Sequence, residues 1–119
     1  MKDYCELRRI LFDEEPSWLG VDLDGTLAKY SGWSDEIGEP IPKMIARVRT
    51  WIAQGHDVRI LTARGSIDPG KHEQLVKVYD WVKKHIGVSL EVTHSKNPFM
   101  KKLYDDRVQK VEANTGAFV

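Results

Sequence analysis

The sequence has little that would connect it to a membrane or to an oxidising compartment. One cysteine, Cys5, occurs among its 119 residues, so the chain has no partner for an internal disulfide and no set of cysteine ligands for zinc. Such low cysteine content is typical of a reducing compartment, and we expect a cytoplasmic protein. No apolar run approaches the ~20 residues that a membrane-spanning helix needs. The stretch from Met1 to Glu6 is too polar for a secretory signal. We therefore expect no membrane partner.

The chain also lacks an excess of charge of either sign. Its 18 basic and 18 acidic side chains give a formal net charge of zero. A neutral chain has no bulk attraction to nucleic acid or to anionic lipid, so nucleic acid is not favoured as a partner, although a local basic patch is compatible with neutrality. No internal repeat, low-complexity segment or linker divides the sequence. We expect residues 1–119 to form a single globular domain.

The pattern of apolar residues predicts an α/β domain. Strands are expected over residues 18–21, 57–62, 89–93 and 103–104, with a fifth over 108–111, and helices are expected over 4–12, from Pro42 to Gly55, and over 71–85. Strands that alternate with helices favour a small, mostly parallel, Rossmann-like sheet flanked by helices. Right-handed crossovers would bring the carboxyl ends of the first, second and fourth strands to one edge of that sheet.

Two aspartates stand one residue apart directly after the first predicted strand, in Asp22-Leu23-Asp24-Gly25-Thr26. Ligands bind at the carboxyl ends of strands in open parallel sheets. Two carboxylates this close need a cation between them, or one of them must hold a proton. The pair therefore suits a hard divalent metal ion and a nucleophilic carboxylate. The alternative is that Asp24-Gly25 is only a turn between two strands. The complete segment from Asp22 to Thr26 makes this alternative weaker.

Other polar residues follow the later strands at corresponding positions. Thr62 ends the second predicted strand, and Asp105 and Asp106 follow the fourth. Because the strand ends share one edge, we expect Asp22, Asp24, Thr62 and Asp105 to surround one crevice. A polar turn with an ion pair to the next residue, Arg107, is the alternative for the acidic pair.

Three lysines are candidates for a positive charge at this crevice. Lys96 follows the third predicted strand, where the crevice opens, whereas Lys101 and Lys102 lie in or beside the short fourth strand. Side chains alternate along a strand, so at least one of the latter two must point away. Position therefore favours Lys96.

Two roles are possible for each of Arg64 and Trp33. Arg64, two residues after Thr62, could contact a phosphate or carboxylate of a substrate through its planar guanidinium, or could pair with a local acid such as Asp68. Trp33, in the loop after the paired aspartates, is interpreted as a packing residue, and a role in base stacking is the alternative.

Taken in order, these motifs resemble those of the haloacid dehalogenase (HAD) superfamily of phosphohydrolases. The resemblance runs from about Trp18 to Asp106, and the segment that contains Asp22 and Asp24 matches the first motif throughout. It implies that Asp22 is a nucleophile that forms an aspartyl-phosphate and that Asp24 is the general acid and base.

The resemblance also implies a Mg²⁺ cofactor and a phosphorylated substrate. Asp22, the backbone carbonyl of Asp24 and Asp105 would hold the ion, with Asp106 in support. Thr62 would donate a hydrogen bond to a phosphoryl oxygen, and Lys96 would supply positive charge during transfer. A phosphotransferase with the same intermediate, and a non-catalytic HAD-fold protein that binds a metal or a phosphorylated partner, are the alternatives.

The spacing of the motifs leaves no room for a separate cap domain. The loop over residues 28–42, called the flap below, is rich in glycine and proline and is the native element placed to cover the nucleophile. Capless relatives act on large substrates or borrow a lid from a neighbouring subunit, so a homo-oligomer is one alternative.

Overall fold

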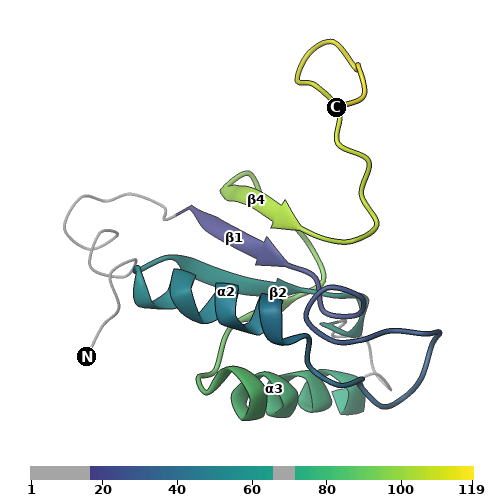
Figure 1. Ribbon diagram of the computed structural model, residues 1–119, viewed down its shortest axis with the longest axis vertical. Coiled ribbons are helices and arrows are strands. Elements are labelled where there is room, and N and C mark those ends of the chain that lie inside the picture. The colour runs from purple at the N-terminus through teal and green to yellow at the C-terminus, as the bar shows by residue number, and fades with distance from the viewer. Residues whose placement is uncertain (1–16, 66–71) are drawn as a thin grey trace.

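The computed structural model describes residues 17–65 and 72–119. Its centre is a sheet of four parallel strands in the order β3-β2-β1-β4, of which Figure 1 labels β1, β2 and β4. The strands are β1 (Trp18–Val21), β2 (Asp57–Leu61), β3 (Val92–Thr93) and β4 (Met100–Tyr104). This is the small parallel α/β sheet that the sequence predicts.

Strand β1 lies in the interior of the sheet, between β2 and β4, and all four of its residues are buried. Val21 at its end pairs with Ile60 of β2 on one side and with Tyr104 of β4 on the other. A strand with neighbours on both sides and no exposed face is expected to read as a continuous apolar run, as this one does. Asp22, the residue after β1, therefore lies at the carboxyl end of a central strand, between the ends of β2 and β4.

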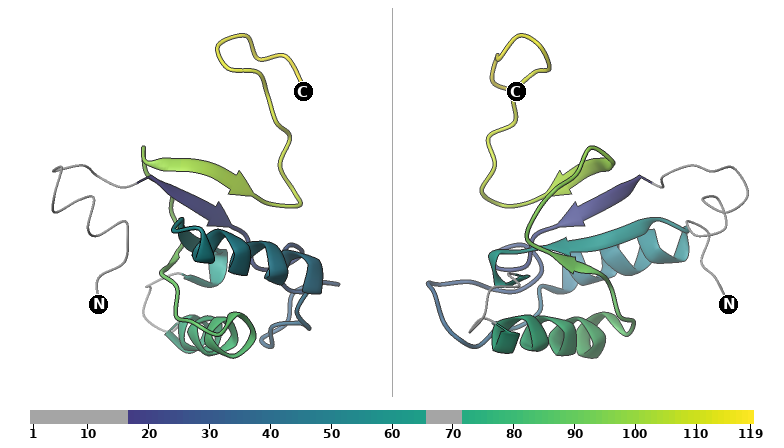
Figure 2. Two further views of the ribbon diagram at one scale, coloured as in Figure 1. Left: turned by 60° about the vertical axis from the view of Figure 1, so that its left-hand side comes forward. Right: turned by 180° about the vertical axis from the view of Figure 1, so that it is seen from behind.

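Two helices pack against the sheet, α2 (Pro42–Ala53) and α3 (His72–Ile86). Pro42 occupies the first turn of α2, where its missing N–H costs nothing. The apolar side of α2 buries Ile45 and Val48. Arg49 of α2 donates hydrogen bonds to the carbonyls of His85 and Ile86 at the end of α3, so the two helices lie side by side. Viewed from behind, β2 passes in front of α2 (Figure 2, right).

The order of the strands places a topological switch at β1. The chain steps from β1 through α2 to β2 and through α3 to β3 in one direction, and then returns to add β4 on the other side of β1. Ligand sites of parallel α/β sheets lie outside the carboxyl ends of the strands at such a point. Asp22 after β1 and Asp105 after β4 are neighbours there.

Several predicted elements differ from the structure. The third predicted strand shrinks to Val92–Thr93, and the fourth is longer than predicted, beginning at Met100. The fifth predicted strand, over 108–111, is wrong: this segment leaves the sheet, and Val111 makes only an isolated antiparallel bridge with Phe118. The chain from 108 to 119 extends away from the body of the molecule (Figure 1), so these apolar residues have no sheet edge to join.

The remaining expectations concern the N-terminal helix, the segment between β1 and β2, and membrane-spanning helices. The helix predicted over 4–12 lies outside the described residues. Between β1 and β2 the chain forms the flap and α2. Within the two described segments, no helix combines the length and apolar character that crossing a bilayer requires.

Candidate functional site

A cavity of about 390 Å³ opens at the carboxyl ends of the strands. Its lining comes from the ends of β1, β2 and β4 and from the flap: Asp22, Asp24, Tyr30, Trp33, Thr62, Ala63, Asp105 and Arg107. The four residues that the sequence analysis expected around one crevice are all among them. The structure thus brings Asp22, Asp24, Thr62 and Asp105 together, and their chemical roles stay predictions.

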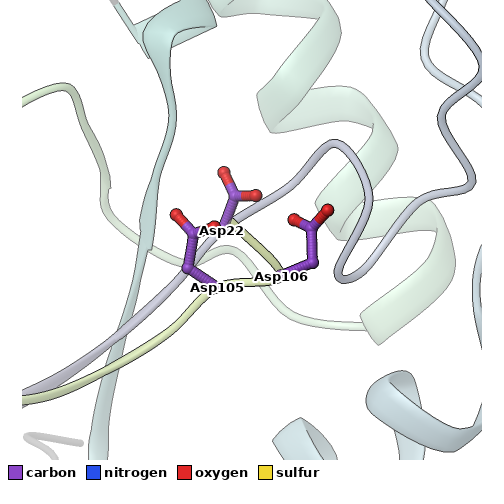
Figure 3. A group of neighbouring side chains, drawn as sticks. All are labelled: Asp22, Asp105 and Asp106. Atoms are coloured by element: carbon purple, nitrogen blue, oxygen red, sulfur yellow. The ribbon is translucent and has the colours of Figure 1, made fainter. Parts of the chain in front are cut away.

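Three carboxylates converge beside this cavity. Asp22, Asp105 and Asp106 each offer an oxygen that lies within 4.8 Å of the others. In Figure 3 the three side chains come from two adjacent chain segments and point to the same side. Burial, followed by the charge of Asp105, raises the pKa of Asp22 to about 7. The ionised form of Asp22 is therefore unfavourable by itself, and a bound cation would stabilise it.

The donor set fits a hard divalent cation. Mg²⁺ prefers carboxylate oxygens and is usually held by one or two of them together with water and substrate phosphate. Asp22 and Asp105 are half-buried and Asp106 is exposed, so the cluster keeps an open side for water or a phosphoryl group. The cluster therefore meets the chemical requirements of the Mg²⁺ site that the resemblance implies.

Thr26 links two of these carboxylates. Its hydroxyl lies 3.2 Å from Asp106 Oδ1 and 3.5 Å from Asp22 Oδ2, and it accepts a hydrogen bond from the backbone N–H of Asp106 at 3.1 Å. Gly25, between Asp24 and Thr26, has a φ of +89°, and a Cβ at this position would lie 2.5 Å from Asp106 Oδ2. The turn after Asp24 thus holds the segment after β4 in place, and glycine is the residue that permits both the conformation and the close approach.

Arg64 is buried and pairs with Asp24. Its Nε donates to Asp24 Oδ2 at 2.9 Å and its Nη2 donates to Oδ1 at 3.2 Å, while 1% of its side chain is exposed. Its other donors reach Gln74 Oε1 and the carbonyl of Ser34. A carboxylate offers about four lone-pair sites, so the pair leaves two of them on Asp24 for other partners.

This pairing directs Arg64 to acceptors of the protein, and a contact of Arg64 with substrate stays a prediction. Its guanidinium is occupied by protein acceptors, and Arg64 is not among the residues that line the cavity. The alternative of an ion pair with an acid is right, but the acid is Asp24, because η1 (Ala63–Gly65) turns Arg64 back towards the end of β1. Asp68, the acid suggested from the sequence, lies outside the described residues.

The flap is tied to α3 and to Arg64. The carbonyl of Ser34 accepts from Arg64, and that of Gly38 accepts a 3.0 Å hydrogen bond from the indole N–H of Trp81 on α3. At its base, Ala28 and Pro40 form an antiparallel bridge. The flap therefore forms one wall of the cavity in a defined position, with Tyr30 and Trp33 among the lining residues.

Thr62 and Lys96 lie in contrasting places. Thr62 is 5% exposed and lines the cavity. Its hydroxyl oxygen accepts the backbone N–H of Arg64, which leaves the hydroxyl hydrogen to donate. Lys96 is exposed, three residues after β3, and is not among the lining residues. Among the described residues of the lining, Arg107 is the cation, and its backbone N–H donates to Asp105 Oδ1 at 2.8 Å.

Sequence reasoning missed the parts that depend on contacts between distant segments. The sequence predicts Thr26 only as part of a motif, and Arg107 only as an ion-pair partner. A signal for Thr26 existed, because a hydroxyl two residues after Asp24 is near enough to reach the end of a neighbouring strand. Nothing in the sequence shows that Arg107 faces the cavity, since that depends on the turn after β4.

Comparison with known proteins adds support for the fold. A solved structure, described as the conserved protein coded by a locus from Bacteroides thetaiotaomicron, is similar to this chain with a TM-score of 0.59 and 19% sequence identity, over 78% of each chain. Identity at this level shows a shared fold alone. No protein-family model matches the chain, and no curated protein sequence matches it significantly.

Proposed function

We propose that this protein is a Mg²⁺-dependent phosphomonoester hydrolase of the HAD type that acts through an aspartyl-phosphate on Asp22. The observation that carries the proposal is the convergence of Asp22, Asp105 and Asp106 beside a cavity that Asp24 and Thr62 also line. A carboxylate in a cleft whose pKa is strongly raised by burial and by a neighbouring charge, as that of Asp22 is, is typical of a functional site. The proposed setting is the cytoplasm, in keeping with the single Cys5.

Asp22 and Asp105 would hold the ion together with the backbone carbonyl of Asp24, and Asp106 would assist. When bound, Mg²⁺ neutralises carboxylates that would otherwise repel a phosphate dianion, and it polarises the phosphoryl oxygens. Asp106 is exposed, so water would reach a bound ion from this side of the cluster.

The reaction would run in two steps that share one acid-base group. In the first, a carboxylate oxygen of Asp22 forms a bond to phosphorus as the bond to the ester oxygen breaks, and Asp24 donates a proton to the departing oxygen. In the second, Asp24 takes a proton from water as the water oxygen attacks phosphorus, which releases inorganic phosphate and the free carboxylate of Asp22. Both bonds are formed and broken in line, so position is the main demand on the protein.

Other residues in the lining would stabilise the charge that develops on the transferred group. The hydroxyl hydrogen of Thr62 is free to donate to a phosphoryl oxygen, since its oxygen already accepts from Arg64. Arg107 is the cation among the described residues of the cavity wall, and Lys96 is the cation that the resemblance implies. Arg64 would act at one remove, as a positioning residue for Asp24.

The experiment that tests the proposal is hydrolysis of p-nitrophenyl phosphate with Mg²⁺ by the wild type and by Asp22→Asn. We expect phosphate release by the wild type, its loss in a chelator, and its loss in Asp22→Asn with the fold intact by circular dichroism. Equal turnover by Asp22→Asn would remove Asp22 from the mechanism. Turnover that increases with an added alcohol acceptor would favour a phosphotransferase, and metal binding without any turnover would favour a binding protein.

A further inference from the structure

Two aromatic side chains of the flap share the cavity with the carboxylates. Trp33 and Tyr30 both line it, and they are 63% and 43% exposed. An exposed aromatic residue by itself needs no explanation. These two stand in the wall of the cavity that holds Asp22 and Asp24, where a leaving group attached to a bound phosphate would extend.

The indole of Trp33 is held from one side. The guanidinium carbon of Arg64 lies 4.3 Å from the centroid of the Trp33 ring, and Arg64 is itself fixed by its bonds to Asp24, Gln74 and Ser34. A guanidinium over an indole face is a favourable cation–π contact. The ring is therefore positioned before any ligand binds, while most of its surface stays open.

The size of the cavity favours a small ligand. About 390 Å³ falls within the range of roughly 300–1,000 Å³ that is usual for small-molecule sites. The chain has zero net charge, which gives no general attraction to a long polyanion. A single phosphate group with one planar ring system suits this space, with the phosphate at the carboxylate cluster and the ring at the flap.

We infer that Trp33, with Tyr30 beside it, forms a stacking platform that selects phosphomonoesters whose leaving group carries a planar aromatic ring, nucleoside monophosphates being the biological example. The inference rests on the proposed function, because it takes the carboxylate cluster as the phosphate end of the site. The guanidinium covers one part of the indole, and the ligand ring stacks on surface that the guanidinium leaves open. Arg64 thus connects the acid-base residue Asp24 to the platform.

A matched pair of substrates tests this inference. Adenosine 5′-monophosphate and ribose 5-phosphate share the sugar and the phosphate, and only the first carries a base. We expect wild-type kcat/KM to be about tenfold higher for the nucleotide, as stacking on one aromatic side chain commonly provides. Trp33→Leu should remove that preference by lowering kcat/KM for the nucleotide more than for ribose 5-phosphate, whereas Trp33→Phe should retain most of it.

The same pair is then measured by calorimetry on the Asp22→Asn background with Mg²⁺, where no turnover is expected. Adenosine 5′-monophosphate should bind about tenfold more tightly than ribose 5-phosphate, and Trp33→Leu should equalise the two. An equal loss for both ligands in Trp33→Leu would mean that Trp33 only supports Arg64, and would overturn the platform while leaving the phosphatase proposal intact. Absence of hydrolysis of every phosphomonoester would overturn the phosphatase proposal, and the calorimetric preference would then decide the platform separately.

Discussion

Arg64 donates hydrogen bonds to both carboxylate oxygens of Asp24, at 2.9 and 3.2 Å, across 40 residues of sequence. The arginine is buried and the aspartate stands in the cavity wall. A bidentate pair of this kind fixes the direction of a carboxylate as well as its distance. The pair joins η1, which follows β2, to the turn that follows β1. The fold of the domain therefore sets the orientation of the proposed acid-base group, Asp24.

Removal of either partner should destabilise the protein through the group left behind. We expect Arg64→Met and Asp24→Asn each to lower the free energy of unfolding by about 2–3 kcal/mol, because a largely buried charge loses its partner. The double variant should lose less than the sum, with a coupling of about 1–3 kcal/mol in urea unfolding. Additive losses would contradict the pairing. The exposed pair Lys77–Glu36 is the control, and Lys77→Met should leave the free energy of unfolding nearly unchanged.

The raised pKa of Asp22 predicts a pH dependence of stability in the metal-free protein. An unfolded aspartate ionises near 3.8, and in the folded protein burial and Asp105 raise the pKa of Asp22 to about 7. The stability that protonated Asp22 contributes is therefore full below pH 3.8 and is lost as the pH rises through 7. At pH 8 in a chelator we expect Asp22→Asn to be more stable than wild type.

The size of this effect is bounded. One pKa unit corresponds to about 1.4 kcal/mol, and contact of the half-buried carboxylate with water reduces the total, so we expect a gain of the order of 1–2 kcal/mol. Urea unfolding at pH 8 and near pH 4 measures it, and the gain should shrink at the lower pH. Added Mg²⁺ should stabilise wild type at pH 8 and have a smaller effect on Asp22→Asn. Equal stability of the two proteins at pH 8 would contradict the account of Asp22.

Gly25→Ala should disturb the acidic cluster. Gly25 and Gly87 both have a positive φ, +89° and +99°, but a Cβ at Gly25 would strike Asp106 whereas one at Gly87 would meet nothing within 4 Å. Gly87→Ala should cost about 1 kcal/mol from backbone conformation alone. Gly25→Ala should cost more in thermal or urea unfolding and should also weaken Mg²⁺ binding in calorimetry, which Gly87→Ala should leave unchanged. Equal Mg²⁺ affinity in both variants would show that Gly25 serves only the turn.

Arg107→Met and Lys96→Met separate two assignments of the cation at the phosphate. Arg107 lines the cavity, and Lys96 is exposed outside its lining. We expect Arg107→Met to lower kcat/KM for p-nitrophenyl phosphate by at least about tenfold, because it removes positive charge next to the transferred group. A larger loss in Lys96→Met would instead uphold the assignment made from the resemblance. Steady-state kinetics at saturating Mg²⁺ measures both.

The sequence predicted what depends on local pattern. The buried run at Trp18–Val21 identified the central strand, and Pro42 and Gly55 marked the limits of α2. Because strand ends in a parallel sheet share an edge, the convergence of Asp22, Thr62 and Asp105 followed from the order of the elements. No side-chain contact was needed for that inference.

What the sequence could not predict depends on where turns send single side chains. The turn at η1 directs Arg64 to Asp24, and no local pattern encodes that partner. The apolar residues over 108–111 suggested a strand, but a strand also needs a partner of suitable register, and this segment leaves the sheet. The link from Thr26 to Asp106 crosses 80 residues, so it exists only once β1 and β4 have paired.

The measurement that bears most directly on the central claim is the location of the phosphoryl group during turnover. Wild type mixed with substrate and Mg²⁺ is quenched within a single turnover, treated with borohydride to reduce acyl phosphates, and mapped by peptide mass spectrometry. The account predicts modification at Asp22 alone, absent when Mg²⁺ is chelated. Sustained phosphate release with no modification of Asp22, or with modification at another residue, would contradict it.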